Sequence, residues 1–130
     1  MIVADASVIV QACLSKVDVE SLSSHRLIAP GLLWSESVSL IHELKWRQRI
    51  STALASAALD KLRRAPVQQR HPAALRREAW RLAERFGWAK TYDAEYIALA
   101  VLTKCRLLTI DARLSAVASQ LVEVIGPADL

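Results

Sequence analysis

Residues 2–10 have the sequence IVADASVIV, a run of aliphatic residues that an aspartate, Asp5, interrupts. The first residues of this run predict a short buried strand, and Asp5 stands where a helix begins. Burying a carboxylate without a partner costs several kcal/mol, so the position of Asp5 needs an explanation. Near the C-terminus, residues 107–114 (LLTIDARL) repeat the pattern with Asp111. The two aspartates therefore require a joint explanation.

Short apolar runs alternate with segments of helical periodicity along the whole chain. Runs at 2–5, 27–30, 106–111 and 121–125 predict strands, and RAPVQQRHP (64–72) predicts a weaker, more polar one. Such strands, separated by helices, imply a parallel sheet covered on both faces. We therefore expect an α/β protein, a three-layer α/β/α sandwich, in a single domain over residues 1–130. Helices are expected at 5–14, 17–24 and 31–48, after Ser51, from Pro72 to Gly87, and at 91–104 and 112–120.

Composition indicates a folded protein with no membrane segment. Hydrophobic residues make up 53% of the chain and charged residues 23%, which suits a packed core and argues against disorder. No uncharged run is long enough for a transmembrane helix. The first residues lack the positive charge of a secretion signal, and Asp5 interrupts the apolar run. A cytoplasmic location is the expectation.

Positive charge is concentrated in the middle of the chain. Residues 45–85 hold 11 Lys and Arg against 3 Asp and Glu, a net charge of +8, whereas the rest of the chain is net negative. This separation favours a polyanionic partner, although a solvated face of basic helices would look the same. Arg77, Arg81 and Arg85, spaced by four, form one basic stripe that is a candidate for RNA binding. The four tryptophans are interpreted as core or dimer packing in preference to base stacking.

Four acidic residues stand where a parallel sheet would bring them together. Asp5 and Asp111 end strands, Asp93 lies in the first turn of a helix, and Glu36 lies on the apolar face of another. Taken alone, Asp93 suits the helix dipole and Asp111 suits an N-cap, whereas Asp5 fits capping less well and Glu36 does not fit it at all. Taken together, the four favour a divalent cation, because close carboxylates repel one another. Mg²⁺ or Mn²⁺ is the expected ion, with the hydroxyls of Ser7 and Thr109 in support.

An acidic metal site beside a basic segment suits phosphodiester hydrolysis. IVADASVIV, LLWSESVSLIHEL, TYDAEYIALA and LLTIDARL, in this order, resemble the motifs of the PIN-domain ribonucleases, and among them the VapC-type toxins of toxin–antitoxin pairs. The last two motifs are the most specific. The resemblance spans residues 2–114, nearly the whole chain.

The resemblance implies a PIN-like fold over residues 1–130 and Mg²⁺- or Mn²⁺-dependent endoribonuclease activity on RNA. It also implies a homodimer and a cognate VapB-like antitoxin. Asp5, Glu36, Asp93 and Asp111 match the acids of the family. In one departure, Ser39 stands where an Asn often follows the glutamate. The polar stretch 64–72 is a second departure, because it is less hydrophobic than expected for a central strand of the family.

Two other functional classes are alternatives to a nuclease. A non-catalytic PIN-like binding module, acting in a protein or RNA complex, is the main alternative, although such a module would more often lack one of the four acids. A phosphotransfer domain is disfavoured, because Asp5 has no acidic neighbour and Ser7 occupies the place of the second aspartate of a dehalogenase. The three glycines are not clustered, so no phosphate-binding loop is expected.

Overall fold

The structure, a computed structural model that describes residues 1–130, is built around one sheet of five parallel strands. The strands are ordered β3-β2-β1-β4-β5 across the sheet, and each has only two or three residues. They are β1 (Ile2–Ala4), β2 (Leu27–Ala29), β3 (Val67–Gln69), β4 (Arg106–Leu108) and β5 (Val124–Ile125).

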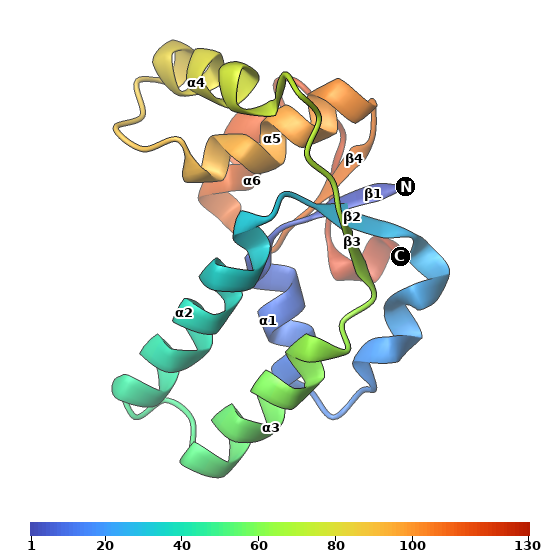
Figure 1. Cartoon of the computed structure of the whole chain (residues 1–130), viewed down its shortest axis with the longest axis vertical. Helices are drawn as coiled ribbons and strands as arrows, with labels where there is room; N and C mark the ends of the chain where they lie inside the picture. Colours follow the sequence, from blue (N-terminus) through green and yellow to red (C-terminus); the bar gives the residue numbers. More distant parts are fainter.

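Helices cover both faces of this sheet. Figure 1 shows α1, α2 and α3 gathered on one side and α4, α5 and α6 on the other, which confirms the predicted α/β/α sandwich. None of the helices combines the length and the apolar character needed to cross a lipid bilayer. The helices are α1 (Ala6–Leu14), α2 (Leu32–Trp46), α3 (Thr52–Arg63), α4 (Leu75–Phe86), α5 (Tyr92–Thr103) and α6 (Ala112–Ala118), with 3₁₀ helices η1 (Val19–His25) and η2 (Pro127–Asp129).

The strand order reverses between β1 and β4. The chain first builds outward from β1 through β2 to β3, and then crosses back over the sheet to β4. β1 and β4 are parallel neighbours, with Ala4 paired to Leu108, so their carboxyl ends lie side by side. In open α/β sheets, the connections diverge at such a reversal and leave a crevice where ligands bind. A ligand site is therefore expected at the residues that follow Ala4 and Leu108.

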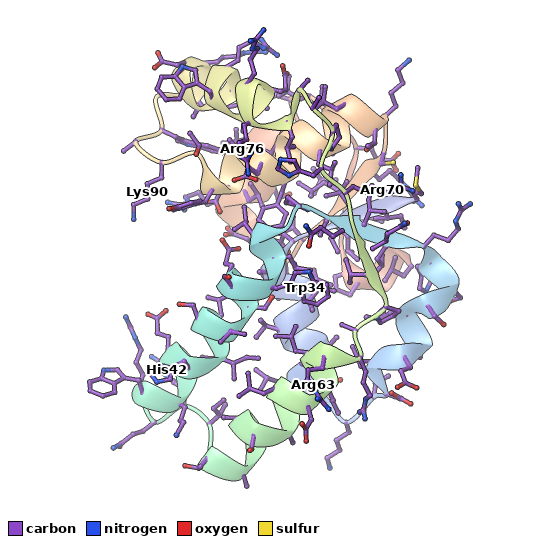
Figure 2. All side chains as sticks on the ribbon, in the orientation of Figure 1. Trp34, His42, Arg63, Arg70, Arg76 and Lys90 are labelled. Carbon is purple, nitrogen blue, oxygen red and sulfur yellow. The ribbon has the colours of Figure 1, made fainter.

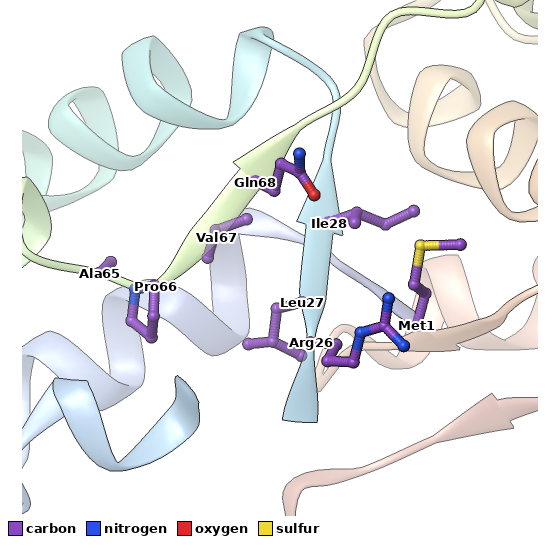
Figure 3. Close-up of a pocket in the computed structure, with 8 residues that line it drawn as sticks. All are labelled: Met1, Arg26, Leu27, Ile28, Ala65, Pro66, Val67 and Gln68. Carbon is purple, nitrogen blue, oxygen red and sulfur yellow. The ribbon is translucent and has the colours of Figure 1, made fainter. Parts of the chain in front are cut away.

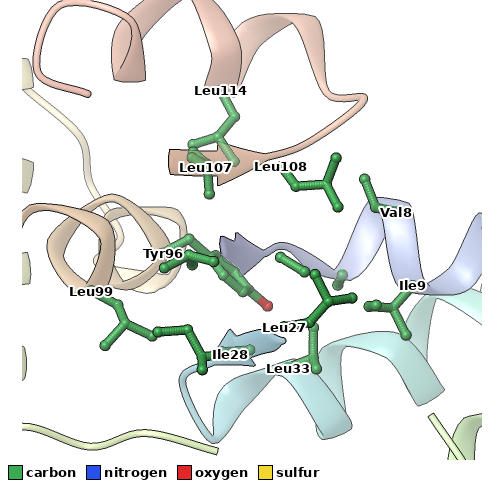
Figure 4. Packing of buried hydrophobic residues seen from close by; sticks show 14 of the residues in the cluster. Val8, Ile9, Leu27, Ile28, Leu33, Tyr96, Leu99, Leu107, Leu108 and Leu114 are labelled. Atoms are coloured by element: carbon green, nitrogen blue, oxygen red, sulfur yellow. The ribbon is translucent and has the colours of Figure 1, made fainter. Parts of the chain in front are cut away.

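A single apolar core fills the space between the sheet and the helices. It comprises 33 buried residues, and the strands β1 and β2 and most of β4 contribute to it. Tyr96 of α5 is the largest of the fully buried side chains, and Figure 4 shows it between the sheet and the neighbouring helices. A tyrosine in this position brings a hydroxyl into an apolar interior, where it needs a hydrogen-bond partner.

Some boundaries differ from those predicted. β4 ends at Leu108 rather than at residue 111: the backbone N–H of Thr109 still donates to Ile125 of β5, but Asp111 is already the N-cap of α6. α4 begins at Leu75, after Pro72, and β5 is restricted to residues 124–125. The helix predicted at 17–24 is the 3₁₀ helix η1, which covers Val19–His25. The polar character of 64–72 is explained by topology: β3 is an edge strand, not a central one, so its two glutamines are exposed.

Ser37 of α2 is fully buried, and its hydroxyl has no hydrogen-bond partner. A buried hydroxyl without a partner destabilises the fold by the cost of its lost hydration. We expect Ser37→Ala to leave the free energy of unfolding unchanged or to raise it by up to about 1 kcal/mol. Ser39→Ala, two positions along and exposed, is the matched control and should stay within about 0.5 kcal/mol. Urea denaturation of both variants checks this; a clear destabilisation by Ser37→Ala would show that the hydroxyl has a partner in solution.

Candidate active site

Asp5 lies at the reversal of strand order, directly after β1. Its backbone N–H donates to the carbonyl of Leu108 at 3.1 Å, which ties it to the end of β4. The side chain is only 4% exposed and forms no ion pair. Its two carboxylate oxygens accept hydrogen bonds from the hydroxyls of Ser7 and Thr109, each at 2.7 Å. Asp5 is therefore a buried carboxylate that is held by two hydroxyls instead of a cation.

Asp5 is also the N-cap of α1, because it accepts a hydrogen bond from the backbone N–H of Val8 at 3.3 Å. The interpretation that Asp5 fits capping poorly was therefore wrong. The short turn from β1 into α1 leaves Asp5 extended, which is the backbone conformation of an N-cap. Asp111 is the N-cap of α6, as the alternative interpretation allowed, and accepts from the N–H groups of Arg113 and Leu114.

Ser7 and Thr109 connect the two aspartate-bearing turns. The hydroxyl of Thr109 accepts from the N–H of Asp111 at 3.0 Å while it donates to Asp5. The hydroxyl of Ser7 accepts from the N–H of Ile110 at 3.3 Å. The predicted supporting hydroxyls thus lie between Asp5 and Asp111 and fix the turn after β1 against the turn after β4.

Glu36 lies in α2 and is half-buried. It accepts a hydrogen bond at 3.1 Å from the hydroxyl of Tyr96, which comes from α5 on the opposite side of the sheet. Sequence analysis missed Tyr96. The signal was present, because Tyr96 follows Asp93 by three residues and so shares its face of the helix. Burial is the main cause that raises the pKa of the Tyr96 hydroxyl, and the negative charge of Glu36 raises it further.

Asp93 lies in the first turn of α5, as predicted, and its side chain is 37% exposed. Its carboxylate lies 3.3 Å from the guanidinium of Arg113, a residue of α6 that sequence analysis did not single out. Arg113 follows the cap Asp111 by two residues, and no feature of its sequence context marked it. A basic side chain thus reaches the acidic group from the helix that Asp111 caps.

The acids influence one another through space. Burial is the main cause that raises the pKa of Asp5, and the charge of Asp111 raises it further, against the lowering effect of its hydrogen bonds. Burial likewise raises the pKa of Glu36, with Asp93 and Asp5 adding to the effect. The structure therefore brings all four predicted acids into one electrostatic group.

As the side chains stand, no three of the acids are arranged to hold a single metal ion. The donor chemistry nevertheless fits a hard divalent cation, because every candidate ligand is a carboxylate or hydroxyl oxygen. Burial is the main cause of the raised pKa values of Asp5 and Glu36, with a smaller contribution from repulsion between the acids, and a bound cation would offset both costs. Binding of a cation by Asp93 would require its release from Arg113.

A cavity of about 450 Å³ opens beside these acids. Glu36 and Asp93 form part of its wall, so the cavity and the acidic group are continuous. A different hollow of about 360 Å³ lies near the amino ends of β2 and β3 and contains no acidic residue (Figure 3). The remaining residues that line the first cavity are Gly87, Trp88, Ala89, Lys90, Tyr92 and Arg113.

The predicted basic stripe lies on α4. Arg81 is paired with Glu78 on the same helix, and the guanidinium of Arg85 lies 5.5 Å from the ring centre of Phe86. Arg77 is exposed. None of the three lines the cavity beside the acids. Their contact with RNA stays a prediction.

The raised pKa of Asp5 gives a pH-dependent prediction for protein kept metal-free with EDTA. In the folded protein Asp5 has a higher pKa than in the unfolded chain, whose Asp5 pKa is the ordinary value of 3.8. The free energy of unfolding of the wild type therefore increases as the pH falls from the folded pKa to the unfolded one. The asparagine side chain of the Asp5→Asn variant is uncharged at every pH. The melting temperature of the variant should therefore exceed that of the wild type at neutral pH, and the difference should vanish on acidification. A difference that grows on acidification would contradict the raised pKa.

Comparison with known families agrees with this arrangement. The model of the PIN domain family matches residues 2–120. The chain belongs to the PIN domain family. It is 35% identical over 116 residues to the VapC ribonuclease Mb0985 of Mycobacterium bovis and to the ribonuclease VapC9 of Mycobacterium tuberculosis, covering 88% of this chain and 89% of each relative.

Solved structures place this PIN domain protein in the same fold. PAE2754 from Pyrobaculum aerophilum superposes with a TM-score of 0.76 at 23% identity, over 98% of this chain and 91% of that one. The VapBC2 structure from Rickettsia felis, bound to a DNA fragment from its promoter, contains a chain that superposes with a TM-score of 0.62 at 14% identity, over 97% and 98% of the two chains. At these identities the similarity establishes the fold alone.

Proposed function

We propose that this chain is a metal-dependent endoribonuclease of the VapC type, the toxin of a toxin–antitoxin pair, acting in the cytoplasm as one PIN domain over residues 1–130. The observation that carries the proposal is Asp5, a buried carboxylate without a basic partner at the reversal of strand order, grouped with three further acids. A protein keeps such a costly arrangement where a bound cation offsets it. The family relatives named ribonucleases support the same chemistry.

In this proposal Asp5, Asp93 and Asp111 hold a Mg²⁺ or Mn²⁺ ion, and Glu36 completes the site or orients the attacking water. When bound, the ion lowers the pKa of water and neutralises charge on the scissile phosphate. Glu36 would accept a hydrogen bond from the attacking water and so orient it, and the Tyr96 hydroxyl holds Glu36 in place. Water adds to phosphorus in line and loses a proton to solvent, the bond to the 3′ oxygen breaks, and this oxygen takes up a proton from solvent. The products have 3′-hydroxyl and 5′-phosphate ends.

We propose two protein partners by analogy with the family: a cognate VapB-like antitoxin that covers the site, and a second copy of this chain in a homodimer. The Rickettsia felis structure is that of VapBC2 bound to promoter DNA, which supports the first. Co-expression with the product of the adjacent gene followed by size-exclusion chromatography with light scattering would test both. A monomer that binds no such product would contradict them without affecting the nuclease proposal.

The deciding experiment is cleavage of total cellular RNA by the purified protein with Mg²⁺, with Mn²⁺ and with EDTA. Cuts that need the metal and disappear in Asp93→Asn support the nuclease. Cuts that are indifferent to EDTA and to the variant are contamination. The assay also includes RNA from cells that express the protein. If thermal shift then shows metal binding but no RNA is cut, the result would favour the non-catalytic PIN-like binding module.

A further inference from the structure

The cavity beside the acids combines aromatic rings and cations in one place. Tyr92 and Trp88 contribute rings, and Lys90 and Arg113 contribute positive charge. Its volume of about 450 Å³ lies within the range of roughly 300–1,000 Å³ that small-ligand sites occupy. Because Glu36 and Asp93 form part of its wall, anything bound in it lies next to the proposed site of hydrolysis.

The two rings differ in how firmly they are held. Trp88 is half-buried, packs against the core, and lies 5.5 Å from Phe86 between ring centres. Tyr92 is 58% exposed, and its hydroxyl forms no hydrogen bond within the protein. Trp88 therefore serves as a fixed wall, whereas the ring of Tyr92 is open to stack on a planar ligand.

The two cations lack strong partners inside the protein. Lys90 is exposed, projects from the loop between α4 and α5 (Figure 2), and forms no ion pair. Arg113 has one contact, with Asp93, while its side chain remains 81% exposed. An ion pair this exposed contributes little, so Arg113 can exchange Asp93 for another anion at small cost.

We propose that this cavity is the binding subsite for one nucleotide of single-stranded RNA next to the scissile phosphate. Tyr92 stacks on the base against the wall formed by Trp88, and Lys90 and Arg113 bind the flanking phosphates. This inference rests on the proposed nuclease function and names residues that bind its substrate. A single strand is required, because a base must leave its stack to lie on Tyr92.

Arg113 has two alternative partners in this arrangement. Without RNA, it pairs with Asp93 and so competes with a cation for that carboxylate. With RNA, it moves to phosphate and leaves Asp93 free. Removing Arg113 therefore has opposite effects on two ligands: Mg²⁺ binds more tightly and RNA binds more weakly. A residue with a merely structural role would not produce this pair of changes.

The test measures binding of a fluorescein-labelled random-sequence single-stranded RNA to wild type and variants in EDTA, by anisotropy at several salt concentrations. Tyr92→Ala should weaken binding by roughly 5- to 100-fold, and Tyr92→Phe should not. Lys90→Ala should reduce the slope of log affinity against log salt by about 0.7. Lys16→Ala and Trp46→Ala, exposed and outside the cavity, are the matched controls and should bind as wild type does.

Mg²⁺ titration by calorimetry, without RNA, tests the second effect. Arg113→Ala should bind Mg²⁺ about two- to fivefold more tightly than wild type, and Lys90→Ala should bind it equally. Unchanged Mg²⁺ affinity in Arg113→Ala together with unchanged RNA affinity in the Lys90 and Tyr92 variants would overturn the subsite.

The failure of this inference is separable from that of the nuclease. If wild type cleaves RNA but Arg77→Ala and Arg85→Ala lose RNA affinity while the cavity variants keep it, the strand binds along α4 and the subsite is wrong. If wild type neither binds nor cleaves RNA, the nuclease proposal itself fails.

Discussion

Asp5→Asn is expected to lose RNA cleavage by at least about a hundredfold while keeping the fold, because a ligand of the catalytic ion contributes several kcal/mol to the reaction. Asparagine is as good an N-cap as aspartate, so the cap on Val8 is retained. The amide removes the charge that burial disfavours. Cleavage rates with saturating Mg²⁺ and melting curves in EDTA measure the two effects separately.

Asp18→Asn is the matched control for this substitution. Asp18 caps η1 by accepting from the N–H of Glu20 and lies outside the acidic group. The Asp18→Asn variant should cleave RNA at the wild-type rate. If Asp5→Asn lowered the melting temperature in EDTA substantially and kept its activity, Asp5 would be a structural cap and not a metal ligand.

Tyr96→Phe is expected to lower the cleavage rate by roughly 10- to 100-fold, because residues that orient a metal ligand matter nearly as much as the ligand. The change removes the hydroxyl that holds Glu36, and keeps the ring that fills the core. The free energy of unfolding should fall by only about 1 kcal/mol. A Mg²⁺ titration followed by thermal shift should show weaker binding, which lost packing alone would not cause.

Thr103→Val serves as the control for Tyr96→Phe. Both residues belong to α5, but the hydroxyl of Thr103 donates to the backbone carbonyl of Leu99 and bonds to none of the four acids. This variant should match wild type in cleavage and in Mg²⁺ binding. Should Tyr96→Phe reduce only the melting temperature, with cleavage and Mg²⁺ affinity unchanged, the role of Tyr96 would be confined to the core.

The layer architecture was predictable because it depends on the alternation of short apolar runs and helical periodicity. The location of Asp5 and Asp111 followed in the same way, since parallel strands end at one edge. Strand lengths were less predictable. The strand-like run continues in sequence to Asp111, but β4 ends at Leu108 because Asp111 already caps α6.

Contacts between distant segments were the part that sequence could not supply. Tyr96 reaches Glu36 across 60 residues, and Arg113 reaches Asp93 across 20. Periodicity gives the face of a helix, but it does not give the partner of that face. Strand order has the same limitation: the polar sequence of β3 is explained once its place at the edge of the sheet is known.

The hydrogen bond between Asp5 and Thr109 spans 104 residues, so it also sets when the acidic group can form. The turn after β1 is synthesised about a hundred residues before its counterpart after β4. Contacts of such sequence separation form late, because nearly the whole chain must be ordered first. A nascent or truncated chain that ends before Thr109 lacks Asp111 and the hydroxyl that anchors Asp5. The acidic group can therefore be complete only once β4 and the turn that follows it have been synthesised and added to the sheet.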